Sequence, residues 1–223
     1  MAGYYFVGII AFAASMLVQW WLRNTYNTWM KRANASGLTG REVARAILEA
    51  NGVNDVKVEM VKGTLTDHYD PTSKTVRLSE GNFGHANVAG MAVAAHEVGH
   101  ALQHNLGYTP LQWRTSLLPV ASIGSQWGPI LAMVGLFLTG GPSILLTIGI
   151  WLFAGAVLFH LVTLPIEFDA SRRALVQLDR LGIVTSQDAG GARSVLTAAA
   201  MTYVAAAATA ITYLIYFIMA SRR

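Results

Sequence analysis

The sequence contains no cysteine and few charged residues for its length. None of its 223 residues is Cys, which excludes disulfide bonds, thiolate metal sites and cysteine nucleophiles. Charged residues make up 13% of the chain, about half the usual share of a soluble domain, whereas 53% of the residues are hydrophobic. Any metal must therefore be bound by His, Asp or Glu, and the composition indicates a protein embedded in a lipid bilayer.

Four apolar stretches are long enough to cross a membrane, which takes about 20 helical residues. They are residues 3–22, 117–138, 143–164 and 194–219. The first could instead be a cleaved signal peptide. However, no basic residue precedes Arg23, and the apolar run exceeds the 7–15 residues of such peptides. An uncleaved anchor is the favoured interpretation, so four transmembrane helices are expected.

The basic residues predict how the chain is oriented. Ten of the 16 Lys and Arg residues lie between Arg23 and Arg114, and four more lie between Arg172 and Arg193. The positive-inside rule places both stretches on the cytoplasmic side of a bacterial-type inner membrane, with both termini outside. With this distribution, the net charge of +4 is a topology signal and not evidence of a nucleic-acid partner.

The polar segment after the first apolar stretch shows signs of a small α+β domain. Residues 39–42 (Thr-Gly-Arg-Glu) have capping-box spacing, and Gly52 is placed to end the helix that follows. Residues 56–60 and 74–78 alternate apolar and polar side chains, which predicts a β-hairpin across the turn-rich link 66–73. The edge of that hairpin could pair with an extended peptide, or the hairpin could simply cover the next helix.

A histidine pair with metal-ligand spacing lies in the helix-like run from Asn87 to His104. Because residues i and i+4 share a helical face, His96 and His100 can both bind one Zn²⁺, and Glu97 is placed to take a proton from water. Zinc lowers the pKa of bound water from about 15.7 to about 7. The small size of Gly99 would let another chain segment or a substrate approach the metal. The pattern predicts a zinc-dependent, peptide-hydrolysing site.

Catalytic zinc usually takes three protein ligands and keeps a fourth position for water. The best third candidate is Glu167, in the run LPIEFDASRR, where Pro165 is placed at the first turn of a new helix. Glu167 could instead be a first-turn acid favoured by the helix dipole. Asp169 points about 200° around the helix from Glu167 and cannot easily share the site. His104 shares a face with His100, but three successive histidines spread along a helix, so an outer-shell or helix-end role suits His104 better.

Peptide hydrolysis also needs a hydrogen-bond donor for the oxyanion that forms during attack. Tyr203 and Arg172 are candidates on the chain beyond Glu167. Tyr203 lies inside the last apolar stretch, where a tyrosine ordinarily serves packing. Arginines at a membrane boundary are ordinary topology markers. The sequence therefore leaves the donor open.

The run AAHEVGHALQH, together with SGLTGREVA, LTDHYDP and LPIEFDASRRA, resembles the YugP family of membrane zinc metallopeptidases over most of the chain. The order of spans and motifs is also similar to that of HtpX and CAAX prenyl protease type gluzincins. The resemblance implies that His96, His100 and Glu167 bind zinc and that Glu97 is the general base.

One position departs from the pattern of those gluzincins. Ser171 stands where they have the aspartate of an ExxxD motif. The hydrogen bond that steadies a zinc-bound histidine is therefore expected to come from another residue, with Asp169 or Asp70 as candidates.

These observations predict a mainly α membrane protein with about four transmembrane helices. A small α+β zincin-like domain, a hairpin plus the HExxH helix, is expected at the cytoplasmic membrane surface. The predicted division is 1–22 (anchor), 23–116 (zincin-like domain), 117–164 (transmembrane hairpin), 165–193 (helix with the third ligand) and 194–223 (last transmembrane helix).

The predicted function is zinc-dependent endopeptidase activity on protein or peptide substrates, with the oligomeric state left open. One alternative is a site-2-type intramembrane protease, which pairs HExxH with a distant LDG-type aspartate. Asp179 lies in Leu-Asp-Arg and lacks the glycine of that motif. The other alternative is a non-catalytic zinc-binding scaffold, but a purely structural site has no use for Glu97.

Overall fold

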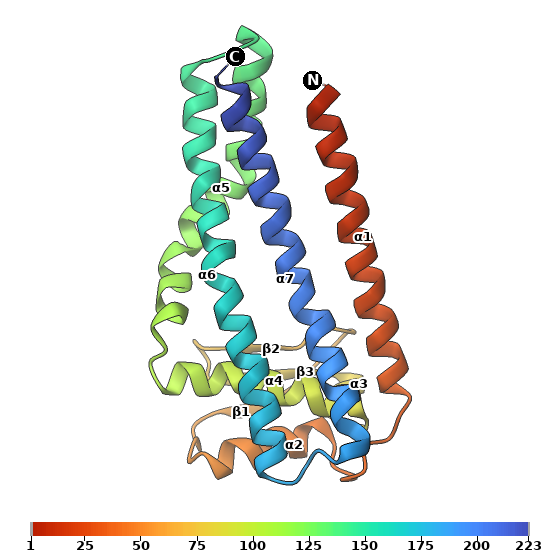
Figure 1. Ribbon diagram of the computed structural model, residues 1–223. Helices are drawn as coiled ribbons and strands as arrows, with labels where there is room; N and C mark the ends of the chain where they lie inside the picture. Colours follow the sequence, from red (N-terminus) through yellow and green to blue (C-terminus); the bar gives the residue numbers. More distant parts are fainter. Residues whose placement is uncertain (1, 223) are drawn as a thin grey trace. The chain divides into compact units, whose positions relative to one another are not determined.

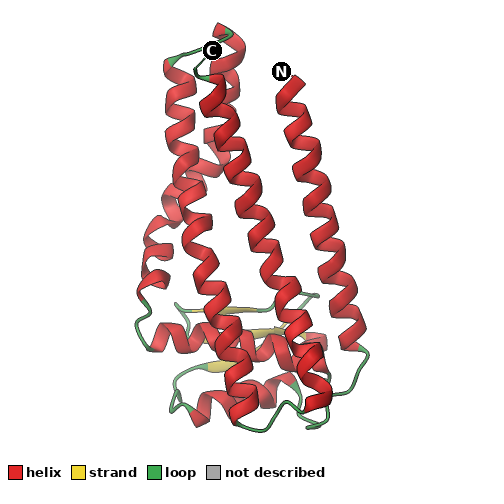
Figure 2. Ribbon diagram, viewed as in Figure 1, coloured by secondary structure: helices red, strands yellow, loops and turns green. Residues whose placement is uncertain are grey.

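The computed structural model describes residues 2–222 and is mostly helical, with one small sheet (Figures 1 and 2). In chain order the elements are α1 (Ala2–Met30), α2 (Gly40–Ala50), β1 (Lys57–Val61), β2 (His68–Asp70), β3 (Thr75–Ser79), α3 (Glu80–Phe83), α4 (Val88–Asn105), α5 (Thr109–Thr139), α6 (Ile144–Arg180) and α7 (Ser186–Ala220).

The chain divides into two compact units. The first, here called the mixed unit, contains Gln19–Tyr108 and Ile166–Met201. The second, here called the apolar unit, contains Thr109–Pro165, the part of α1 up to Val18, and the part of α7 from Thr202 onward. All strands and the HEVGH motif belong to the mixed unit.

The predicted helix after the capping box is confirmed as α2. The Thr39 side chain accepts a hydrogen bond from the Glu42 amide, and the Glu42 carboxylate accepts one from the Thr39 amide at 2.8 Å. Beyond the helix, Gly52 has φ +68°, a conformation that favours glycine. The apolar face of α2, including Val43 and Ile47, is fully buried in the core of the mixed unit.

The sheet differs from the predicted hairpin. β1 pairs with β3 in parallel, with Lys57 opposite Thr75, while β2 pairs antiparallel with β3, so the strand order is β1-β3-β2. The expected direct hairpin between residues 56–60 and 74–78 is therefore wrong. The intervening chain is long enough for a parallel crossover and contains a strand of its own. Asp70 accepts hydrogen bonds from the Thr72 amide and the Ser73 hydroxyl, which closes the turn from β2 into β3.

The HEVGH helix is confirmed and lies in the core of the mixed unit. The Asn87 side chain caps α4 by accepting a hydrogen bond from the Gly90 amide at 2.7 Å, and Gly107, with φ +63°, follows its end. Small residues such as Ala92 and Ala95 are buried, which lets neighbouring elements approach α4 closely. The helix is thus held in place along most of its length.

The predicted helix start at Pro165 is wrong, because α6 runs through this proline from Ile144 to Arg180. A proline inside a helix removes one backbone hydrogen bond, a cost that a long, packed apolar helix can tolerate. Glu167 therefore lies in the interior of a helix. The alternative that it is a first-turn acid favoured by the helix dipole is excluded. The predicted 165–193 segment is the end of α6, a turn with Gly182 at φ +64°, and the start of α7.

Among the described residues, three helices are long and apolar enough to cross a membrane: α5, α6 and α7. They contain the predicted spans 117–138 and 194–219 and all but the first residue of the span 143–164. The predicted first span, 3–22, lies within α1, but several of its residues fall outside those whose side chains are described, so this span stays a prediction. In the apolar unit, a Cβ atom on Gly149 would clash with the Ala132 amide nitrogen, so glycine allows α5 and α6 to pack closely.

The parallel register can be tested by disulfide cross-linking, because the chain has no cysteine of its own. Lys57→Cys with Thr75→Cys should cross-link under mild oxidation, since adjacent strands place paired Cα atoms about 5 Å apart. Lys57→Cys with Ser79→Cys should not, because these positions are four residues out of register, or about 13 Å along the strand. Peptide mass mapping is the readout, and the reverse pattern would contradict the parallel pairing.

Candidate metal centre

Three side chains from two helices of the mixed unit converge on one point. His96 and His100 lie one turn apart on α4, and Glu167 reaches them from α6. Their possible ligand atoms all lie within 4.8 Å of one another. Glu167 Oε2 is 3.3 Å from His96 Nε2 and 3.4 Å from His100 Nε2. The structure thus brings together the three residues that the sequence proposed as ligands.

The two distances from the Glu167 carboxylate to the imidazoles match those of a tetrahedral zinc site. Two ligand atoms about 2.0–2.1 Å from a tetrahedral zinc lie about 3.3–3.4 Å apart. Glu167 Oε2 is fully buried and has no hydrogen-bond partner. A buried carboxylate oxygen without a partner is costly, and a cation beside it removes that cost. The two imidazoles and the carboxylate also form the His₂Glu donor set that catalytic zinc accepts.

The hydrogen bonds of Gln103 determine which His100 nitrogen faces Glu167. Gln103 Nε2 donates to the Ile166 carbonyl at 2.8 Å and to Asp169 Oδ2 at 3.0 Å, and both partners are acceptors. Gln103 Oε1 is therefore the atom that meets His100 Nδ1, at 3.0 Å, and Nδ1 carries the proton. In a neutral His100, Nε2 then has a free lone pair directed at the Glu167 carboxylate. Two acceptors facing each other in this way are suited to a metal cation.

The outer contact of His96 corrects the sequence-based expectation. Ser171 Oγ lies 3.1 Å from His96 Nδ1, so the residue at the aspartate position itself makes the steadying contact. A serine hydroxyl reaches the ring because α6 packs tightly on α4 at this level. Asp70 makes its hydrogen bonds in the β2–β3 turn and with Arg77 instead.

Glu97 lies on the same helix between the two histidines and is 8% exposed. Burial raises the pKa of its carboxyl, and the charge of Asp67 also raises it, whereas positive charge on His96 and His100 lowers it. The net direction is upward. A carboxyl with a raised pKa is a better proton acceptor than an ordinary surface glutamate.

Gly99 allows α6 to pack closely against α4. A Cβ atom at this position would lie 2.6 Å from the carbonyl oxygen of Ala170, a backbone atom that cannot rotate away. The closely approaching segment is therefore α6 itself, and the glycine inside HEVGH allows Glu167 to reach the histidines.

The remaining candidates have different surroundings. Asp169 bonds to Gln103, to Arg173 and, at 2.5 Å, to Arg172, which makes it an outer partner of the His100 hydrogen-bond chain. The Arg172 side chain is 69% exposed. His104 Nδ1 lies 2.9 Å from the Tyr69 hydroxyl, and His104 is not part of the three-residue cluster. Tyr203 lies on α7 in the apolar unit, and its role as an oxyanion donor stays a prediction.

Sequence reasoning did not assign a role to Gln103 or Ser171. Gln103 offered a signal, because it is a polar residue three positions after His100 and so lies on nearly the same face of the helix. Its contact with His100 Nδ1 and its partners on α6 were found only in the structure.

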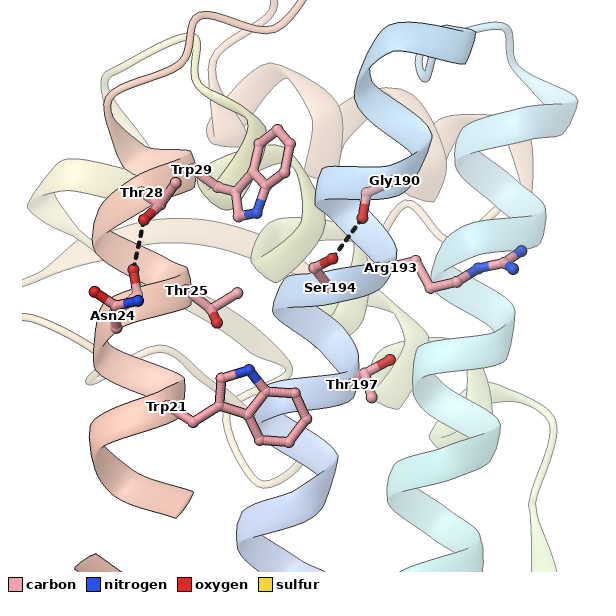
Figure 3. A pocket seen from close by; sticks show the side chains of 9 residues that line it. All are labelled: Trp21, Asn24, Thr25, Thr28, Trp29, Gly190, Arg193, Ser194 and Thr197. Atoms are coloured by element: carbon pink, nitrogen blue, oxygen red, sulfur yellow. Dashed lines mark hydrogen bonds between the residues drawn. The ribbon is translucent and has the colours of Figure 1, made fainter. Parts of the chain in front are cut away.

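A cavity of about 390 Å³ lies between α1 and α7 in the mixed unit (Figure 3). Its lining comprises Trp21, Asn24, Thr25, Thr28, Trp29, Gly190, Arg193, Ser194 and Thr197. Figure 3 shows Trp21 and Trp29 directed from α1 towards α7, while the Arg193 side chain extends away from them. None of the candidate zinc ligands lines this cavity, so the metal centre is elsewhere in the unit.

An HExxH helix faced by a glutamate from a second helix, in a chain with membrane-length apolar helices, is the arrangement expected of a membrane metallopeptidase. The profile of a family described as "Putative neutral zinc metallopeptidase" matches residues 4–222, and the chain belongs to this family. It is 44% identical over 214 residues to "Putative membrane protease YugP" of Bacillus subtilis (strain 168), covering 96% of this chain and 94% of that protein. The resemblance seen in the sequence is thereby confirmed. No solved structure shows significant similarity.

The close approach at Gly99 generates a direct prediction. Gly99→Ala should push α6 away from α4, displace Glu167, and weaken zinc binding by about 10- to 100-fold, the scale seen when support for metal ligands is lost. Gly190→Ala is the matched control, because a Cβ atom there has nothing within 4 Å. Zinc affinity measured by competition with a fluorescent chelator distinguishes them, and equal affinities for both variants would contradict this role of Gly99.

Proposed function

We propose that this protein is an integral membrane zinc endopeptidase in which His96, His100 and Glu167 hold the metal and Glu97 is the general base. The observation that carries the proposal is the buried, unpartnered Glu167 oxygen facing two imidazole nitrogens of the HExxH helix. Family membership and the similarity to a protein named as a membrane protease support the same reaction class.

The ligand residues and the base divide the work of peptide hydrolysis. A zinc ion at the site would supply a Lewis acid that polarises the scissile carbonyl and acidifies water. Glu97 accepts the proton of the attacking water and returns it to the leaving amine, and the raised pKa of its carboxyl suits it to both steps. Gln103 and Ser171 keep the two histidine rings oriented during the reaction.

The edge of the sheet offers a place for an extended substrate. β2 pairs with β3 on one side only, and the contact between Tyr69 and His104 holds it against α4. Asp67, just before β2, lies close enough for its charge to act on Glu97. An added peptide strand along β2 would therefore run past the catalytic helix. We assign the substrates to extended segments of proteins, with membrane proteins as the natural class for an enzyme that spans the bilayer.

The orientation of the site follows from the basic residues. Most of the Lys and Arg residues lie in the sequence of the mixed unit, and the positive-inside rule places such segments in the cytoplasm. A bacterial inner-membrane location with a cytoplasm-facing site is therefore part of the proposal.

The two alternatives have weaker support. In the described residues the metal cluster contains Glu167 and not Asp179, the residue that a site-2-type arrangement would need. A non-catalytic scaffold would not require a buried carboxyl beside the ligands, yet Glu97 occupies that position.

Replacing the base and a ligand separately tests the proposal. Glu97→Gln should keep one zinc per chain but lower the rate of casein cleavage about 10²- to 10⁴-fold, because a neutral amide cannot accept the proton. Glu167→Gln should lose both the zinc and the activity. Zinc content by elemental analysis and cleavage of labelled casein by the detergent-purified protein are the measurements.

The exposed Glu49 on α2 provides the control, and Glu49→Gln should change neither quantity. Wild-type cleavage by Glu97→Gln would exclude Glu97 as the base. Retention of zinc by Glu167→Gln at wild-type affinity would exclude Glu167 as a ligand.

A further inference from the structure

We propose that Gln103 is a positioning residue with two effects on the metal site. It fixes the tautomer of His100, and it fixes the position of the α6 turn that carries Glu167. The proposal rests on the zinc site argued above and adds a residue that lies outside the HExxH motif. Gln103 is on α4 and fully buried, and its Oε1 lies 3.0 Å from Nδ1 of the candidate ligand His100.

Every polar atom of the Gln103 amide is used. Oε1 accepts from His100 Nδ1, one Nε2 hydrogen goes to the Ile166 carbonyl, and the other goes to Asp169. A rotated amide would place its oxygen against those two acceptors and its NH₂ group against the ring nitrogen. That arrangement would leave buried acceptors unpaired, so only one amide orientation is compatible with the site.

The two acceptors on α6 bracket the third ligand. Ile166 precedes Glu167, and Asp169 follows it by two positions. The Gln103 amide therefore hydrogen-bonds to the turn of α6 that carries the Glu167 carboxylate, on both sides of that residue. Gly99 lies one turn before Gln103 on α4 and meets Ala170, which follows on the same part of α6. Gly99 permits the approach of the two helices, and Gln103 fixes their rotation and register.

The site also requires that the side chain at position 103 be uncharged. A carboxylate at position 103 would accept from His100 equally well but would face Asp169, a second carboxylate. Asp169 already pairs with Arg172 and Arg173, so its charge is balanced from the outer side. A glutamine accepts on the histidine side and donates on the Asp169 side, which no other side chain of this length does.

If Gln103 only filled space, a residue of similar size without polar atoms would serve as well. The positioning role predicts instead that the direction of each hydrogen bond matters. An exchange of donor and acceptor between positions 103 and 169 separates the two explanations.

The experiment uses the full chain purified in detergent, zinc as the probe, and chelator competition to measure the zinc dissociation constant. Gln103→Met should weaken zinc binding about 10- to 100-fold. Gln103→Glu should also weaken it, because two carboxylates then face each other. The double variant Gln103→Glu with Asp169→Asn should bind more tightly than Gln103→Glu alone, because the amide introduced at position 169 can donate to the new carboxylate.

Gln177→Met is the matched control. Gln177 is a second amide side chain, on α6, and it exchanges hydrogen bonds with Asn51, at the end of α2 and away from the cluster. Its replacement should leave zinc affinity unchanged. Thermal unfolding of the zinc-free proteins checks folding, and if Gln103→Met does not fold, the comparison between Gln103→Glu and the double variant decides.

Wild-type zinc affinity in Gln103→Met, or no gain in the double variant over Gln103→Glu, would overturn the positioning role. These results differ from a failure of the proposed function. In that case the wild-type protein would bind no zinc, or Glu167→Gln would bind it as tightly as wild type.

Discussion

The contact between the buried Glu167 carboxylate and the two imidazoles of the HExxH helix is the constraint on which the rest of the site depends. A buried charged oxygen without a hydrogen bond is unfavourable, by several kcal/mol for an unpaired charge. Its position 3.3 and 3.4 Å from two ring nitrogens is consistent with a cation that all three groups share. The fold therefore holds in place an arrangement that a shared cation makes favourable.

The elements around α4 and α6 serve this contact. The sheet and α2 bury α4 along its length. At position 99 a side chain would clash with the Ala170 backbone, so the glycine there allows α6 to approach α4 more closely than an ordinary helix–helix distance. Ser171 and Gln103 then hold the outer nitrogens of the two histidines with neutral groups. Asp169, the charged partner of Gln103, forms ion pairs with Arg172 and Arg173, which balance its charge.

Local signals in the sequence predicted the parts of the structure that local chemistry determines. The capping box before α2 and the i, i+4 spacing of His96 and His100 each have a direct geometric meaning. Strand direction does not, because alternation is the same in parallel and antiparallel strands. The two predicted segments do pair as β1 and β3, but the predicted antiparallel direction was wrong. Pro165 was interpreted as a helix start because a proline fits both a first turn and a long packed helix. The outer contacts of Ser171 and Gln103 depend on how α6 crosses α4, which no local pattern in the sequence specifies.

X-ray absorption spectroscopy at the zinc edge can show whether Glu167 binds the metal. In the zinc-loaded, desalted wild-type protein we expect four nitrogen or oxygen ligands at about 2.0–2.1 Å. The outer-shell scattering should correspond to two imidazoles. Glu167→Ala, loaded with zinc and desalted in the same way, should retain too little zinc to give this spectrum. A spectrum with three imidazoles, or one that is the same in wild type and Glu167→Ala, would contradict the assignment of Glu167 as the residue that completes the site.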